Sequence, residues 1–199
     1  MTFNPSDRAA FLGSCFATDL GNELAGVDCK LVNPFGNLYN PASILTAVQR
    51  LDSDKMFTPD DCVEMGAGAG KICSFEHHTF FARESAAEFL RVANEALSSA
   101  RTVWKSCNKV VVVIGNARVW RHLERGVVVS NCLKRPGYEF EHYMLSEEQV
   151  RSMLRTIVET HPEKQFEFRV VPILYKNADE ENALSERILL NAISYICRQ

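Results

Sequence analysis

The residues with the clearest chemical potential are Gly13 and Ser14, which follow the short apolar segment at residues 9–11. We interpret this segment as a β-strand that ends in a tight glycine turn, because glycine has no Cβ to clash when φ becomes unusual. Ser14 then stands at the start of a helix, where free N–H groups and the helix dipole favour developing negative charge. That position suits a nucleophilic hydroxyl. It also suits plain N-capping, which the local pattern alone favours.

Alternating strand-like and helix-like segments position this serine. We expect strands around residues 9–13, 29–32, 109–114 and 166–173, and helices at residues 16–24, 41–48, 86–104, 145–159 and 181–197. The run at 109–114 is apolar on both faces, and that at 166–173 reads as a second interior strand. This alternation predicts an α/β fold, a three-layer α/β/α sandwich with a mostly parallel sheet, formed by residues 1–199 as a single domain.

Two segments interrupt the alternation. Residues 119–120 and 126–129 predict a small hairpin inserted beyond the strand at 109–114. The stretch from 52 to 81 is irregular, and its glycine-rich residues 66–70 predict a flexible loop. These glycines lack the spacing of a phosphate-binding loop, and no strand leads into them.

Composition narrows the class of protein. Hydrophobic residues make up 46% of the 199 residues and the net charge is −3, which gives no electrostatic reason to expect a nucleic-acid partner. No stretch is apolar enough to predict a membrane span, and the N-terminal residues lack the pattern of a signal peptide. The seven cysteines include no C-x-x-C pair, so we expect free thiols and a cytoplasmic location. The oligomeric state is left open.

Small, polar or kinked residues follow each of the four predicted parallel strands. They are Ser14, the loop at 33–36, the pair Gly115-Asn116 and the turn at 172–176. Because ligand sites in open α/β sheets form at the carboxyl ends of the strands, this convergence predicts a pocket there.

The run Gly13-Ser14-Cys15-Phe16-Ala17 resembles the signature of the GSCFA-domain proteins, bacterial proteins related to the SGNH (GDSL-like) esterases and acyltransferases. Four more blocks resemble that family in the same order, at residues 33–41, 112–117, 131–136 and 181–185. The resemblance therefore covers nearly the whole chain.

This resemblance implies a serine ester hydrolase or O-acyltransferase in which Ser14 attacks an ester carbonyl. It assigns stabilisation of the oxyanion to the N–H groups of Ser14 and Gly36 and to Asn116, and preorganised donors of this kind are commonly the largest catalytic contribution. Asn116 stands where the family has threonine, and it could equally be a strand-end turn residue. The implied substrate is a small-molecule ester or an acylated carbohydrate or lipid-like compound, with water or an acceptor hydroxyl releasing the acyl group. No metal or organic cofactor is implied.

The general base is where the chain departs from the family. Tyr175 and Leu133 stand at two positions where the family has histidine. An unperturbed tyrosine has a pKa of about 10 and cannot readily serve as the base. Among the remaining histidines we choose His77, because residues 77–80 resemble a family element that lies over the active site. The alternative is that His77 only lines the pocket.

Other candidates carry weaker predictions. We expect His122 to be exposed in the inserted hairpin, His142 to lie in a loop and His161 to cap a helix C-terminus. Cys15 is an alternative nucleophile, although its side chain should point away from the site. The basic residues Arg121, Arg125, Lys134 and Arg135 could meet an anionic ligand group or form a solvated face.

Two rival functions remain beside the enzyme. The loss of both family histidines favours a catalytically degenerate binding protein that keeps the fold and the serine-lined pocket. A purely structural module would instead lack a concave site near Ser14.

Overall fold

A four-stranded parallel sheet forms the centre of the computed structural model, which describes residues 1–27 and 29–196. Its strands are β1 (Arg8–Gly13), β2 (Cys29–Val32), β5 (Lys109–Ile114) and β9 (Gln165–Val170), in the order β2-β1-β5-β9. The prediction of β5 as a central strand is confirmed, since it pairs with β1 and β9 and is buried along residues 110–114. The prediction of an interior β9 is wrong. This strand lies at the edge of the sheet, and its side chains, Glu167 and Arg169 among them, are partly exposed.

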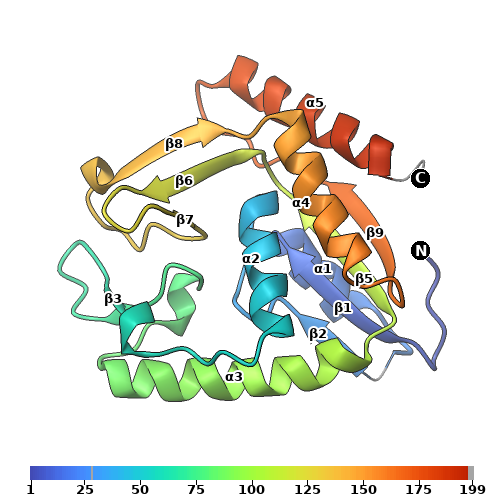
Figure 1. Cartoon of the computed structure of the whole chain (residues 1–199), viewed down its shortest axis with the longest axis horizontal. Coiled ribbons are helices and arrows are strands. Elements are labelled where there is room, and N and C mark those ends of the chain that lie inside the picture. Colours follow the sequence, from blue (N-terminus) through green and yellow to red (C-terminus); the bar gives the residue numbers. More distant parts are fainter. Residues whose placement is uncertain (28, 197–199) are drawn as a thin grey trace.

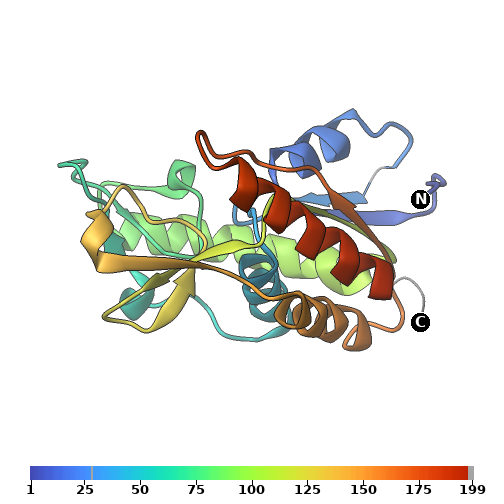
Figure 2. The ribbon, with the colours of Figure 1, turned by 90° about the horizontal axis from the view of Figure 1, so that it is seen from above.

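Helices cover both faces of this sheet, so the chain has the predicted α/β layers (Figures 1 and 2). Helix α1 (Cys15–Glu23) packs on one face over alternate residues of β1 and β5. The other face is covered by α2 (Pro41–Asp52), α3 (Ala86–Ser106), α4 (Glu147–Glu159) and α5 (Asp179–Ile196). The expected last helix thus forms, although its final residue, Cys197, lies outside the described residues.

A second, antiparallel sheet contains the small hairpin that the sequence predicts, formed by its first two strands, and adds a third strand to it. It contains β6 (Arg118–His122), β7 (Val127–Val129) and β8 (Phe140–Met144), in the order β7-β6-β8 (Figure 1). His142 therefore lies in a strand opposite Trp120, and not in a loop. His122 is 4% exposed because its ring packs against Phe75 and Phe140, so the prediction of an exposed His122 is also wrong.

Short elements occupy the stretch that the sequence marks as irregular. They are η1 (Pro59–Asp61), β3 (Val63–Glu64), β4 (Ile72–Cys73) and η2 (Thr79–Phe81), while η3 (Gly137–Glu139) precedes β8. Gly66, in the glycine-rich loop between β3 and β4, is pressed against another segment, because a Cβ there would lie 2.1 Å from the carbonyl oxygen of Lys134. Its N–H also donates to the carbonyl of Leu133. This end of the predicted flexible loop is thus fixed by a backbone contact.

Residues 33–40 cross the carboxyl ends of β1 and β5, and this crossing segment shapes the whole edge of the sheet. The N–H of Leu38 donates to the carbonyl of Gly13, and the carbonyl of Tyr39 accepts from the N–H groups of both Gly115 and Asn116. Gly13 adopts φ +128°, and a Cβ there would lie 2.0 Å from the carbonyl oxygen of Val113. Only glycine fits that position.

Asn33 anchors the start of the crossing segment. Its Oδ1 accepts from the N–H of Gly13 at 2.8 Å, and its Nδ2 donates to the carbonyl of Ser14 and to Oγ1 of Thr18. The residue is buried and adopts φ +39°, a region in which asparagine is favoured over most other residues. One side chain therefore joins the ends of β1 and β2 to the first turn of α1.

None of the described helices is both long enough and apolar enough to cross a bilayer. The six cysteines within the described residues are all free.

We predict that Asn33→Ala lowers the free energy of unfolding by about 1–3 kcal/mol, because it leaves the buried N–H of Gly13 without an acceptor. The measurement is urea denaturation followed by circular dichroism. Asn177→Ala is the matched control, since Asn177 also adopts a positive φ, is exposed and makes no side-chain hydrogen bond to a described residue. Equal losses in the two variants would assign the effect to the backbone conformation alone.

Candidate functional site

Ser14 occupies the N-cap position of α1 but does not cap it. Its backbone has the extended conformation of an N-cap, yet its side chain makes no capping hydrogen bond. The capping role that the local pattern favours is therefore absent. Oγ is buried and has no hydrogen-bond partner among the described residues. The hydroxyl is thus uncommitted and also closed off from solvent.

The backbone donors assigned to the oxyanion already have acceptors. The N–H of Ser14 donates to the carbonyl of Val113 at 2.9 Å, and that of Gly36 donates to the carbonyl of Asn33 at 2.8 Å. The N–H of Asn116 donates to Tyr39, as described above. An oxyanion bound by the N–H of Ser14 or of Gly36 would have to displace one of these bonds, whereas the side-chain NH₂ of Asn116 donates to no described residue.

His77 lies in an aromatic enclosure and not in the hydrogen-bonding position of a base for Ser14. Its ring packs against four phenylalanine rings, those of Phe35, Phe57, Phe81 and Phe89. Nδ1 forms a 2.7 Å hydrogen bond with Oγ of Ser74. Nε2 is buried without a partner, as is Oγ of Ser14, so the two atoms are not hydrogen-bonded to each other. Burial, with a smaller contribution from the charge of Arg50, lowers the pKa of His77 to about 3.

The neighbouring residue, His78, is the histidine that contacts the block at residues 33–41. A Cβ on Gly36 would lie 2.3 Å from Cβ of His78, and the N–H of His78 donates to the carbonyl of Phe35. The element at 77–80 therefore lies against the loop after β2, with His77 turned inward.

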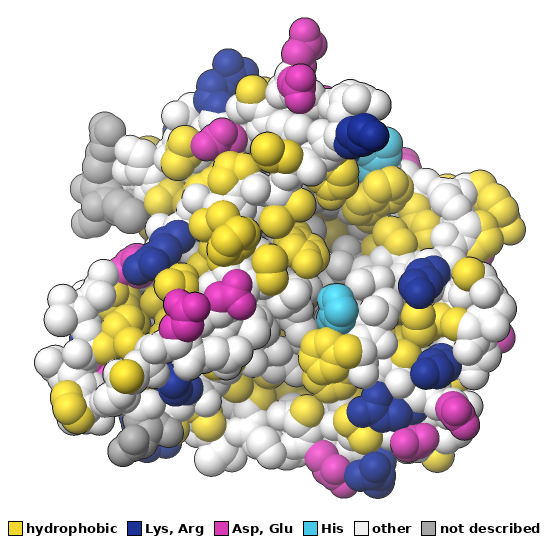
Figure 3. Space-filling view, turned by 180° about the vertical axis from the view of Figure 1, so that it is seen from behind, with side chains coloured by type: hydrophobic (Ala, Val, Ile, Leu, Met, Phe, Trp, Pro, Cys, Tyr) yellow, Lys and Arg dark blue, Asp and Glu magenta, His cyan; other side chains and the backbone are white. Residues whose placement is uncertain are grey.

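A cavity of about 190 Å³ opens beside the ends of β5 and β9, and we call it the asparagine cavity. Its lining includes Asn40, Asn116, Asn131, Arg118, Trp120 and Tyr175. It brings together Asn116 and Tyr175, two of the positions that the sequence singles out, whereas Ser14, Gly36 and His77 do not line it. On the side opposite to Figure 1 the surface is hollowed near its centre, with hydrophobic side chains around the hollow and a histidine at its rim (Figure 3).

Helix α5 fixes two turns at this cavity. Oδ1 of Asn182 accepts from the N–H of Tyr175, and its Nδ2 donates to the carbonyl of the same residue. Oγ of Ser185 accepts from the N–H of Ala117. These contacts explain why a polar block opens the last helix.

Sequence reasoning missed three polar residues that matter for this cavity, Asn40, Asn131 and Arg118, the last of which lies outside the predicted basic set. Asn40 caps α2 through Ser43, and its position before Pro41 is a signal for an N-cap, not for a ligand. Asn131 lies in the loop after β7, in the block where Leu133 replaces a family histidine. That position, Leu133, is fully buried at φ +53°.

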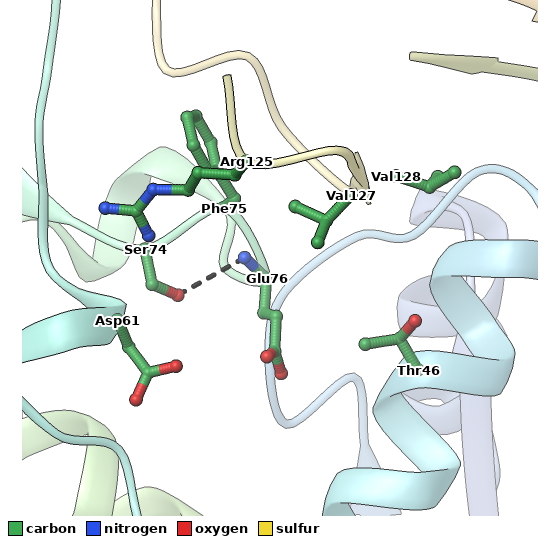
Figure 4. Close-up of a pocket in the computed structure, with 8 residues that line it drawn as sticks. All are labelled: Thr46, Asp61, Ser74, Phe75, Glu76, Arg125, Val127 and Val128. Carbon is green, nitrogen blue, oxygen red and sulfur yellow. Dashed lines mark hydrogen bonds between the residues drawn. The ribbon is translucent and has the colours of Figure 1, made fainter. Parts of the chain in front are cut away.

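A larger cavity of about 400 Å³ lies between α2, the residues near β4 and the hairpin of β6 and β7 (Figure 4). Its carboxylates, Asp61 and Glu76, both pair with the guanidinium of Arg50, and Arg125 lies across from them. Ser74 also lines this cavity, and its Oγ accepts from the N–H of Glu76. Its charged groups are thus largely satisfied within the protein.

The predicted basic residues do not form one free patch. Arg121 and Arg135 pair with Glu141 and Glu139, and the guanidinium of Arg125 donates to the backbone carbonyls of Asp60 and Cys62. Within residues 1–27 and 29–196, no three histidine, cysteine or acidic side chains gather so that they could hold a metal ion.

Comparison with known proteins gives one match. A sequence model described as the GSCFA family matches residues 8–199. No curated protein and no solved structure matches the chain.

We predict that the burial of His77 makes the protein less stable in acid. The unfolded chain binds a proton near pH 6.5 whereas the folded chain does so only near pH 3, so stability is fully present above pH 6.5 and is lost as the pH falls toward 3. The free energy of unfolding should fall by about 1.4 kcal/mol per pH unit in that window from this residue alone.

The measurement is urea denaturation across this pH range, for wild type and His77→Gln. The variant should show a shallower pH dependence, because glutamine does not titrate. An imidazole signal of His77 that titrates near pH 6.5 in the folded protein would contradict the prediction directly.

Proposed function

Because the chain belongs to the GSCFA family, we propose that it is a ligand-binding member of that family, related to the SGNH hydrolases but catalytically degenerate. Its binding site is the asparagine cavity at the carboxyl ends of β5 and β9. In this proposal Ser14 is a buried residue of the fold and not a nucleophile.

The observation that carries this proposal is the contrast between Ser14 and Asn116. Oγ of Ser14 is sealed from solvent, and the backbone donors around it are bonded to carbonyls. The side chain of Asn116 lines the cavity instead, and no described residue accepts a hydrogen bond from its Nδ2. A group that is to react must be reached by substrate and base, whereas a group that is to bind must only be open to the ligand.

The side chain at position 175 supports the same proposal. Tyr175 stands where the resembling family has histidine, and the guanidinium of Arg118 lies 4.2 Å from the centre of its ring. The phenol ring stacked on this guanidinium forms one wall of the asparagine cavity. The relation to SGNH hydrolases is supported by the parallel sheet with helices on both faces and by a serine directly after β1.

The second candidate is a serine-dependent ester hydrolase or O-acyltransferase. It is favoured by the hydroxyl of Ser14, which has no hydrogen-bond partner among the described residues. A serine that capped the helix would accept a hydrogen bond from a backbone N–H of its first turn. In this candidate residues 33–40 move away from the ends of β1 and β5, which opens Ser14, and the turn within this segment that bonds the N–H of Gly36 to the carbonyl of Asn33 opens as well. His77 would have to leave its aromatic enclosure to act as the base.

We predict that a fluorophosphonate probe, which modifies only activated serines, leaves the folded wild-type protein unlabelled. The measurement is intact-protein mass spectrometry of wild type, Ser14→Ala, Ser74→Ala and His77→Gln after exposure to the probe. A known serine esterase in the same reaction controls for the activity of the probe.

Two labelling patterns would overturn the proposal. Labelling that is lost in Ser14→Ala and falls in His77→Gln would establish the hydrolase candidate. Labelling that is lost only in Ser74→Ala and His77→Gln would place the nucleophile at the one serine that His77 contacts by a hydrogen bond.

A further inference from the structure

The three asparagines of the asparagine cavity hold their amide groups in the same way. Oδ1 of Asn40 accepts from the N–H of Ser43 at 2.9 Å, that of Asn116 from Arg118 at 3.1 Å, and that of Asn131 from Leu133 at 2.8 Å. A backbone N–H can only donate, so each bond fixes which end of the amide is oxygen. Each side chain therefore turns its NH₂ group away from its own turn.

These NH₂ groups remain available to a ligand. No described residue accepts a hydrogen bond from Nδ2 of Asn40, Asn116 or Asn131, and none of the three atoms is among the buried atoms without a partner. They therefore keep contact with solvent, and the space that all three residues line is the asparagine cavity. Asn40 and Asn116 are 6% and 4% exposed, so most of each side chain is buried around the open donor. Polar groups of buried residues normally have hydrogen-bond partners within the protein, so NH₂ groups without a protein acceptor are unusual at such residues.

The cavity offers donors and one cation, and no carboxylate lines it. Arg118 supplies the charge, and it pairs with the mostly exposed Glu181 at its outer side while its plane covers Tyr175. A guanidinium has five N–H donors, so this pair leaves donors for a second acceptor. Burial raises the pKa of the Cys132 thiol to about 11, so this lining residue adds no negative charge near neutral pH.

The walls and the volume limit the size of the ligand. About 190 Å³ is less than the roughly 300–1,000 Å³ of pockets that enclose drug-sized molecules. Trp120 and Val129 add apolar wall area beside the three amides. A small cavity with apolar walls, three amide donors and one guanidinium suits a short organic chain with an anionic head.

We propose that the asparagine cavity binds a small organic carboxylate, or the carboxylate end of a larger ligand, through the NH₂ groups of Asn40, Asn116 and Asn131 and the guanidinium of Arg118. A carboxylate has two oxygens with about four acceptor positions, which matches these four donor groups. The inference rests on the proposed function, because it takes this cavity to be the ligand site. It adds the chemical class of the ligand.

The test is a titration of ¹⁵N-labelled protein with acetate, propionate and butyrate at constant ionic strength, followed by the side-chain NH₂ signals of asparagine. Binding should shift the signals of the three cavity asparagines, which are assigned by their loss in Asn40→Asp, Asn116→Asp and Asn131→Asp. Each of these variants keeps the oxygen that accepts the local backbone N–H, so the turns are preserved. Each replaces the donor by a negatively charged oxygen and should weaken carboxylate binding about tenfold or more.

Gln165→Glu is the matched control. It adds the same charge at an exposed position at the start of β9, the opposite end of the strand from the cavity, and should leave binding unchanged. Equal weakening in Gln165→Glu would assign the effect to net charge and overturn the proposal.

Two further probes test whether binding requires a negative charge and whether it prefers a carboxylate over another anion. Propionamide has the shape of propionate without its charge, and equally strong binding of it would overturn the carboxylate assignment. Inorganic phosphate that bound more tightly than the carboxylates would also overturn it. No shift of the three signals with any probe would do the same.

Failure of the proposed function has a different signature. Fluorophosphonate labelling at Ser14 with carboxylate binding intact would overturn the binding-only function and leave the carboxylate site in place. An unlabelled protein that binds no carboxylate would overturn the carboxylate site alone.

Discussion

The arrangement of the site depends on how residues 33–40 satisfy backbone groups at the ends of two parallel strands. Strands that end at one edge leave N–H and C=O groups without partners, and burying such groups unpaired destabilises a fold. Here Leu38 and Tyr39 bond to the ends of β1 and β5, and Asn33 bonds to the turn between β1 and α1. The backbone donors at the site are occupied too, because the N–H of Ser14 donates to the carbonyl of Val113 and that of Gly36 to the carbonyl of Asn33. The chain therefore gains a well-bonded sheet edge at the position where a hydrolase would keep donors open.

This constraint moves the accessible part of the edge away from β1. The cavity forms where β5 and β9 end and the antiparallel sheet begins, and its donors are side-chain amides held by their own turns. Tyr175 forms one wall of the cavity. Its ring stacks on the guanidinium of Arg118, and its backbone N–H donates to Asn182. The aromatic enclosure of His77 lies apart from this cavity, packed on α3 through Phe89. Polar recognition and aromatic packing are thus separated in the structure.

The sequence predicts most of the layered core because hydrophobic patterns and local signals decide it. The β-branched run of β5 and the proline at the start of α2 each identify their element. It misplaces β9 as an interior strand, since edge position depends on pairing between distant segments. The burial of His122 against Phe75 is also a long-range contact, and no local pattern reports it. For the site, the sequence identifies Ser14 and Asn116 as candidate residues. It does not predict which hydrogen-bond donors are free, because that depends on hydrogen bonds between separate loops.

The three asparagines of the asparagine cavity come from three distant parts of the chain, the start of α2, the end of β5 and the loop after β7. A molecule held by all three would bind only the folded chain, because unfolding separates these segments. Occupancy would then raise the free energy of unfolding by RT ln(1 + [L]/Kd), about 2.7 kcal/mol at a ligand concentration one hundred times Kd. Asn131 follows β7 of the antiparallel sheet and Asn116 follows β5 of the parallel sheet, so the ligand would act as a non-covalent cross-link between the two sheets.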